Sequence, residues 1–153
     1  MKFYKICKYK YSNENYKKEW SSIKQIKDFK TAREYIKTEK EYIKAIINFF
    51  NIYKKFKIEI LEIYCKKNIN KKILNKYKQT FLHEQNIKDL VYISKLFLRE
   101  KIWCKFIVDY NKNAYICFGD NYYLLIGIDE NVSIKNILLN TNLYYYDWHN
   151  VFE

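Results

Sequence analysis

Residues 102–128 read IWCKFIVDYNKNAYICFGDNYYLLIGI, which is three apolar runs separated by two short breaks. The runs cover 102–109, 114–119 and 122–128 and are rich in β-branched and aromatic residues, the types that favour strands. The breaks, at 111–113 and 119–121, contain asparagine, glycine and aspartate, which favour tight turns. Connections this short join antiparallel strands, because a parallel pair needs a long crossover. This stretch therefore predicts an antiparallel sheet.

Helical patterns precede this stretch. Thr31 and Glu34 are spaced as a capping box, and apolar residues recur at helical spacing after them to about Tyr53, which predicts a long helix. Residues 66–85 predict a lysine-rich amphipathic helix, and 86–101 predict an apolar one that begins at an N-cap asparagine. A shorter helix is expected at 133–139.

Alternating residues predict further strands at 2–9, 56–65 and 143–146. The alternation of 56–65 slips between Ile60 and Leu61, which indicates a β-bulge. This order of elements lacks repeated strand–helix–strand units and favours the α+β class. We expect a single domain over residues 1–153, with an antiparallel sheet packed against two or three main helices, because 153 residues fit one hydrophobic core.

Composition excludes several classes of protein. Hydrophobic residues make up 49% of the chain and aromatic residues 20%, which is too apolar for a disordered protein. Two glycines and no proline leave no glycine-rich phosphate loop. No apolar run approaches the roughly 18 residues of a membrane span, and residues 1–11 lack the apolar block of a signal peptide. We therefore expect a cytoplasmic protein with no membrane contact.

The net charge of +12 is a weak indicator of function on its own. Lys, Asn, Ile, Tyr and Phe supply 92 of the 153 residues and share A/T-rich codons, so an A/T-rich genome would enrich lysine without selection for charge. Charge distribution is more informative. Residues 120–153 carry five acidic residues and one lysine, and this acidic segment belongs to an otherwise basic chain.

The residues that usually carry chemistry form no recognisable motif. The four cysteines, at positions 7, 65, 104 and 117, include no CxxC pair, and only His83 and His149 could join them in a metal site. His83-Glu84 lacks the second histidine of a metalloprotease helix. His149 stands close to the end of the sequence, where catalytic precision is rare. We expect no catalytic residues, no metal and no cofactor.

Glu39 falls in the middle of the apolar stripe of the 31–53 helix. A carboxylate there is costly unless it is paired, and arginine suits a partly buried carboxylate better than lysine does. Arg33 and Arg99 are the two arginines of the chain. We expect a structural pair between Glu39 and Arg99. The alternative is that Glu39 lies at a groove edge and meets a basic group of a partner.

The C-terminal quarter is the predicted partner-binding surface. Consecutive aromatic residues there cannot all point into the core, and tyrosine and tryptophan are common interface anchors. The residues expected to contribute are Asp120, Tyr122, Tyr123, Tyr145, Asp147 and Trp148. The acidic residues among them would attract a basic protein partner. The alternative is an RNA- or DNA-binding module that uses the lysine-rich helix at 66–78.

Several short stretches, in this order, resemble a family of bacterial immunity proteins that neutralise polymorphic or contact-dependent growth inhibition toxins. They are Glu19-Trp20-Ser21-Ser22 with Ile26, Glu34-Tyr35-Ile36 with Glu39 and Tyr42-Ile43, Leu98-Arg99-Glu100 with Trp103-Cys104, and Phe118-Gly119 with Tyr122-Tyr123 and Gly127. The resemblance spans about residues 16–128. It implies a small non-enzymatic cytoplasmic protein that binds a cognate toxin domain, such as a nuclease, and covers its active site or substrate surface. Nucleic acid is then not the expected partner.

Overall fold

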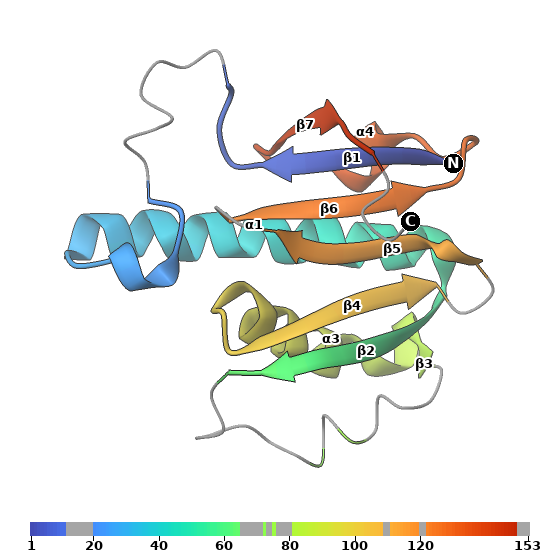
Figure 1. The fold of residues 1–153 in the computed structure, drawn as a ribbon, viewed down its shortest axis with the longest axis horizontal. Helices are drawn as coiled ribbons and strands as arrows, with labels where there is room; N and C mark the ends of the chain where they lie inside the picture. Colours follow the sequence, from blue (N-terminus) through green and yellow to red (C-terminus); the bar gives the residue numbers. More distant parts are fainter. Residues whose placement is uncertain are drawn as a thin grey trace.

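The computed structural model describes residues 1–11, 20–64, 72, 75, 81–108, 111–119 and 122–149. Within them the chain forms one seven-stranded sheet in the order β3-β2-β4-β5-β6-β1-β7 (Figure 1). The strands are β1 (Lys2–Cys7), β2 (Lys55–Ile63), β3 (Phe81–Leu82), β4 (Ile102–Val108), β5 (Asn111–Gly119), β6 (Tyr123–Ile128) and β7 (Tyr144–Asp147). Every neighbouring pair is antiparallel, as predicted for the strands of 102–128, but the first predicted turn is misplaced, because residues 111–113 already belong to β5.

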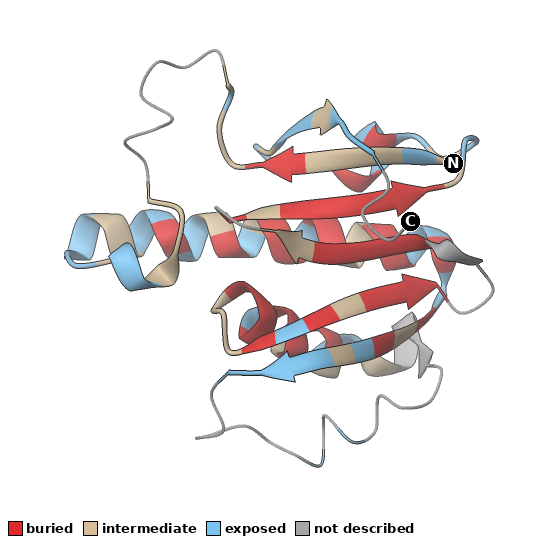
Figure 2. Ribbon diagram, viewed as in Figure 1, coloured by how far each residue is buried: buried red, intermediate tan, exposed pale blue. Residues whose placement is uncertain are grey.

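The helices cover one face of this sheet. The long helices α1 (Phe29–Tyr53) and α3 (His83–Leu98) both lie behind the strands in Figure 1, and the short helix α4 (Ile134–Ile137) contacts α1. Figure 2 shows buried residues along α1 and α3 where these helices lie behind the strands. The predicted α+β class, with an antiparallel sheet against its main helices, is confirmed.

Aromatic side chains dominate the core between the helices and the sheet. Phe50 of α1, Phe97 of α3 and Phe106 of β4 are fully buried, with the Phe97 and Phe106 ring centroids 5.3 Å apart in an edge-to-face arrangement. Burying one such side chain contributes about 1.5–3 kcal/mol. The opposite, helix-free side of the sheet is called the open face below. A smaller cluster of Tyr115, Cys117 and Leu125 is buried separately from the main core, and strand alternation places it on the open face.

The start of α1 differs from the prediction. Asp28, not Thr31, is the N-cap: its backbone is extended and its carboxylate accepts a hydrogen bond of 2.9 Å from the Thr31 amide. Thr31 lies inside the first turn. Both residue types suit an N-cap, and aspartate is the stronger cap because it adds a negative charge at the helix N-terminus. α1 ends before Lys54, whose φ is 66°.

Two other predictions concern residues on either side of the partly described 65–80 segment. The bulge in β2 is confirmed, because the pairing of β2 with β4 shifts register between Ile60 and Glu62. The predicted lysine-rich helix over 66–85 lies largely outside the described residues, although Lys72 and Asn75 are helical. Within it Phe81 and Leu82 are not helical, since they pair with β2 as β3, whereas residues 83–85 are helical and begin α3. None of the described helices is both long and apolar enough to span a membrane.

Candidate functional site

The predicted pair between Glu39 and Arg99 is confirmed. Arg99 Nε lies 2.7 Å from Glu39 Oε1 and Nη2 lies 2.9 Å from Oε2, which is the two-pronged geometry that arginine offers a carboxylate. The Glu39 side chain is 3% exposed and that of Arg99 is 39% exposed. The hydrogen bond to Glu39 raises the pKa of Arg99. The pair therefore fastens the middle of α1 to the residue that follows α3.

Tyr122 is buried, whereas the sequence analysis placed it on an exposed surface; it lines the sheet-end pocket described below, and its role in partner binding stays a prediction. Its side chain is fully buried, and its ring centroid lies 4.9–5.5 Å from those of Trp20, Tyr35, Tyr42 and Phe118. Its φ of 58° places it in the turn that precedes β6. Alternation then sends Tyr122 to the core and Tyr123 to the open face. Sequence alone does not tell which of two adjacent tyrosines turns inward.

The polar atoms of Tyr122 have contrasting environments. Its carbonyl accepts a 2.9 Å hydrogen bond from the Tyr42 hydroxyl, which holds the turn against α1. Its own hydroxyl is buried without a partner at hydrogen-bonding geometry among the described residues. The nearby Tyr35 hydroxyl donates instead to Leu98 O at 3.2 Å. Burial raises the pKa of Tyr122 far above its ordinary value, so this hydroxyl stays protonated.

The other predicted contact residues are divided between the two faces of the sheet. Tyr145 lies opposite Ile6 and Asp147 opposite Tyr4 in the β1–β7 pair, and Ile6 faces the helices. Tyr145 and Asp147 therefore lie on the helix side of an edge strand. Tyr123, by contrast, packs with the open-face cluster. Asp120 lies outside the described residues.

The Lys5 side chain lies among aromatic rings on the open face. Its Nζ atom lies 3.9 Å from the ring centroid of Tyr123, 5.0 Å from that of Trp148 and 5.3 Å from that of Tyr11. The Trp148 amide donates to Phe3 O at 2.9 Å, which holds the tryptophan beside β1. A resident ammonium thus covers the rings that a cationic group of a partner would have to contact. Tyr123 and Trp148 therefore already contact a cation within the chain, and their predicted role in partner binding stays a prediction.

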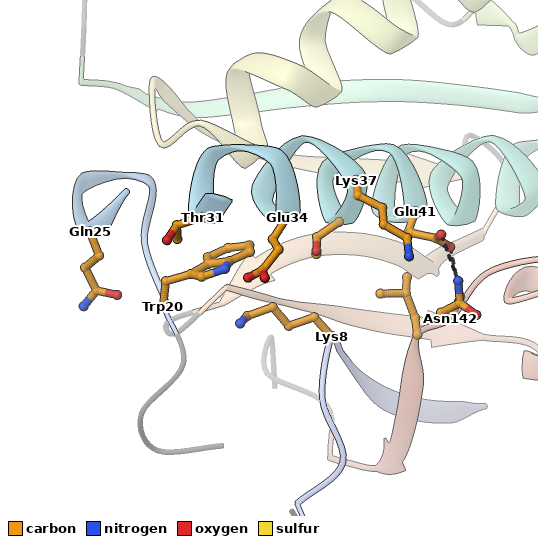
Figure 3. A pocket seen from close by; sticks show the side chains of 10 residues that line it. Lys8, Trp20, Gln25, Thr31, Glu34, Lys37, Glu41 and Asn142 are labelled. Carbon is orange, nitrogen blue, oxygen red and sulfur yellow. Dashed lines mark hydrogen bonds between the residues drawn. The ribbon is translucent and has the colours of Figure 1, made fainter. Parts of the chain in front are cut away.

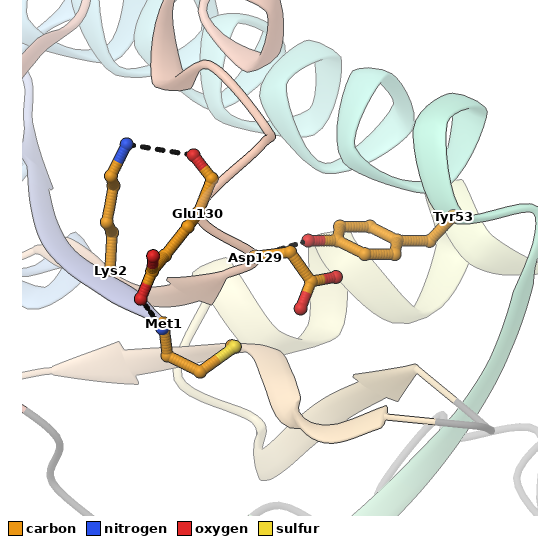
Figure 4. Close-up of polar contacts among 5 residues, drawn as sticks. All are labelled: Met1, Lys2, Tyr53, Asp129 and Glu130. Atoms are coloured by element: carbon orange, nitrogen blue, oxygen red, sulfur yellow. Dashed lines mark hydrogen bonds and ion pairs between the residues drawn. The ribbon is translucent and has the colours of Figure 1, made fainter.

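In the fold, basic groups near the N-terminus lie beside the described acidic part of the C-terminal segment. β1, which carries Lys2 and Lys5, lies between β6 and β7. Glu130 is held by β1 as well: its Oε1 is 2.9 Å from the Met1 amine, and its carbonyl accepts a hydrogen bond from Lys2 Nζ (Figure 4). The contact with the amine lowers the pKa of Glu130. The folded chain therefore mixes charges that the sequence separates.

A pocket of about 900 Å³, called the sheet-end pocket below, lies where β4 begins and β5 ends. Exposed Tyr64 and Trp103 form its rim, and buried Phe97 and the partly buried Phe118 form its floor. Trp103 is 43% exposed. It lies between Ile102 and Cys104, which face the core, so the alternation of this strand in the sequence already indicates an outward-facing tryptophan.

Two features shape the polar and aromatic edges of the sheet-end pocket. Lys24 Nζ lies 3.8 Å from Glu100 Oε2 at the rim, an ion pair open to solvent that contributes about 0–1 kcal/mol. Gly119 lies directly under the ring of Tyr123, its cross-strand neighbour, where any Cβ atom would collide with the ring. The rim is therefore polar on one side and aromatic on the other.

A second hollow, of about 870 Å³, runs along the flank of α1 and is called the α1 groove below (Figure 3). Lys8 and Trp20 point into it opposite Glu34, and Lys8 Nζ lies 4.0 Å from the Trp20 ring centroid. Glu41 accepts hydrogen bonds from the backbone amide of Asn142, at 2.9 Å, and from its side chain. The groove carries both charges, so it has no net preference for an anion or a cation.

The described residues that could act as nucleophiles or ligands are buried or dispersed. Cys7, Cys104 and Cys117 are buried free thiols, and burial raises the pKa of Cys117 to about 12. Cys65 lies outside the described residues. His149 is exposed and stacks on Trp148 with 4.8 Å between ring centroids. Among the described residues no group of three or more His, Cys, Asp or Glu side chains is placed to hold a metal ion.

Comparison of the chain with protein-family models, with curated proteins and with solved structures found no match.

Proposed function

We propose that this chain is a bacterial immunity protein, a non-enzymatic inhibitor that binds a cognate toxin domain in the cytoplasm. The observation that carries the proposal is the sheet-end pocket, where Trp103 and Tyr64 stay exposed above an apolar floor. Large exposed aromatic residues beside a pocket are typical of the anchor regions of protein interfaces. The resemblance to immunity proteins includes Trp103 and Glu100, which both line this pocket.

Inhibition of the toxin would require only that this protein cover part of the toxin's surface. An immunity protein blocks a toxin by covering its active site or its substrate surface, and this needs shape and anchor residues rather than chemistry. A buried aromatic anchor typically contributes about 2 kcal/mol or more to binding, while its neighbours contribute little. We assign this anchor to Trp103, with Tyr64 beside it. A nuclease domain is the toxin we expect.

Co-expression with the product of the gene directly upstream would test the proposal. Cells that express that product should die without this protein and survive with it. Trp103→Ala should weaken binding of the purified partner at least tenfold in calorimetry. Trp148→Ala is the matched control, because Trp148 is similarly exposed, at 39%, but lies beside Lys5.

Three outcomes would count against the proposal in different ways. If Trp148→Ala lost binding and Trp103→Ala did not, the toxin-binding surface would be the C-terminal segment, as the sequence predicts. Failure of the parent protein to protect cells or to bind the upstream product would remove the immunity function. Salt-dependent binding of RNA or DNA by the isolated protein, without protection, would favour the nucleic-acid-binding alternative.

A further inference from the structure

Five basic side chains lie in one line along the outer surface of α1. They are Lys30, Arg33, Lys37, Lys40 and Lys44, all exposed, and they are called the α1 basic strip below. Their spacing alternates between three and four residues. At 100° per residue they fall within an arc of about 80°, opposite the side of α1 that is buried in the core. The strip is therefore the most outward-facing part of the helix.

The acidic residues of α1 are absent from this arc. Glu39 is turned into the core and bound by Arg99. Glu34 and Glu41 lie on the flank that borders the α1 groove, and Glu41 is held by Asn142. The strip consequently presents a single sign of charge along about 21 Å of helix, at 1.5 Å per residue. Basic residues gathered on one side of a helix create an electrostatic field that points in one direction, whereas lysines scattered over the surface do not.

Apolar side chains border the strip on its other flank. Phe29, at the start of α1, is 83% exposed, and Ile36 is also exposed one heptad later. A shallow hollow of about 460 Å³ over the strip is lined by Lys30, Arg33, Lys37 and Lys40, together with Ile36 and Glu34. The cations therefore have an apolar residue on one border and a carboxylate on the other. Phosphate groups would use the cations but gain nothing from Phe29 or Ile36, whereas a protein surface would use both.

We propose that the α1 basic strip is a second contact region, separate from the sheet-end pocket, and that it docks on an acidic surface of the toxin domain, with Phe29 and Ile36 packed against apolar residues at its border. The inference rests on the proposed immunity function and names the chemistry of the partner. It reverses the polarity expected from the sequence, because the acidic C-terminal segment is interleaved with β1 in the fold. The strip accelerates association, and the apolar border slows dissociation.

Charge reversal on the strip provides the test. The variant Arg33→Glu/Lys37→Glu/Lys40→Glu should lose at least tenfold in its association rate with the upstream gene product at low salt. Its rate should also depend less on sodium chloride than that of the parent. The matched control is Lys88→Glu/Lys95→Glu/Lys135→Glu, which makes the same change in net charge at exposed positions elsewhere and should stay within about twofold of the parent. Circular dichroism checks that both variants fold.

A second variant separates a protein partner from a phosphate backbone. Phe29→Ala should raise the dissociation rate several-fold and leave the association rate unchanged. Equal association rates for the strip variant, the control and the parent would overturn the inference and leave the immunity function standing. Failure of the parent to bind the upstream product would overturn the immunity function itself. Loss of duplex DNA binding in the strip variant, with toxin binding intact, would assign the strip to nucleic acid instead.

Discussion

Among single residues, Glu39 and Arg99 are unequal members of their pair. If Arg99 is replaced by alanine, the Glu39 carboxylate is left uncompensated in the core. If Glu39 is replaced, the guanidinium retains access to water because its side chain is 39% exposed. Removing one member of a buried pair costs about 3–5 kcal/mol, and we expect Arg99→Ala to reach this range. Glu39→Ala should cost less.

Urea denaturation of the two variants measures the difference. Glu34→Ala, an exposed glutamate of the same helix, is the control and should stay within about 0.5 kcal/mol of the parent. Adding Glu39→Gln to Arg99→Ala should recover part of the loss, since it removes the buried charge. Equal stability of Arg99→Ala and the parent would show that the pair does not brace the helices.

Two buried tyrosines should respond in opposite ways to the same substitution. Tyr122→Phe removes a buried hydroxyl that makes no well-aligned hydrogen bond among the described residues, although it interacts with the Tyr35 hydroxyl, so it should raise the free energy of unfolding by up to about 1 kcal/mol. Tyr42→Phe removes the donor to Tyr122 O and should lower it by about the same amount. Thermal melts of both variants measure whether Tyr122→Phe stabilises the fold and Tyr42→Phe destabilises it. A destabilising Tyr122→Phe would mean that its hydroxyl has a partner after all.

At the level of elements, the N-cap of α1 should give the chain a measurable response to acid. The hydrogen bonds from the Thr31 hydroxyl and amide lower the pKa of Asp28 in the folded state. Its stabilising contribution is therefore complete above the unfolded pKa, about 3.9, and is lost as the pH falls through the lowered folded value.

Melting temperatures of Asp28→Ala and the parent across pH 2–7 measure this contribution. The variant should melt lower at pH 7, and the difference should narrow below about pH 4. Ser133→Ala is the control, because Ser133 caps α4 without a side-chain hydrogen bond and should change little. A difference between Asp28→Ala and the parent that persists unchanged at pH 2 would argue against a role for the charge.

Local sequence patterns predicted an element or a contact correctly where the residues allowed only one structural interpretation. The phase slip at Ile60 indicated the bulge, and a carboxylate within an apolar stripe indicated the pair with Arg99. The start of α1 was misplaced because Asp28 and Thr31 both suit an N-cap. Tyr122 was misplaced because alternation determines that adjacent tyrosines face opposite sides but not which side each takes. Trp103 could have been found from the alternation of β4.

For the whole molecule, the sheet order predicts cooperative unfolding. β1 is the first strand in the sequence but pairs with both β6 and β7, so it cannot leave the sheet without breaking two strand pairings. Circular dichroism and tryptophan fluorescence should report one coincident thermal transition. Its enthalpy should be about 110 kcal/mol for 153 residues, at about 0.7 kcal/mol per residue. Two separate transitions would show that the halves of the sheet unfold independently.

The candidate binding surface was harder to predict than the fold, because it depends on pairing between strands that are far apart in the sequence. Counting charges along the sequence assumed that residues 120–153 stay together. The insertion of β1 places Lys5 between Tyr123 and Trp148, and no local pattern contains that information. The α1 basic strip was hidden for a different reason, since its lysines were discounted together with the rest of a lysine-rich composition.

The position of β1 also matters while the protein is being made. β1 emerges from the ribosome about 120 residues before its partner β6, a delay of roughly 6–24 s at about 5–20 residues per second. Throughout that time both of its edges are open to any other extended chain. Lysine side chains oppose such pairing, and Lys2 and Lys5 interrupt the apolar residues of β1. Lys2→Thr should therefore lower the soluble yield of cell-free synthesis, yet leave refolding of the finished chain from urea unchanged, because there β6 is present from the start.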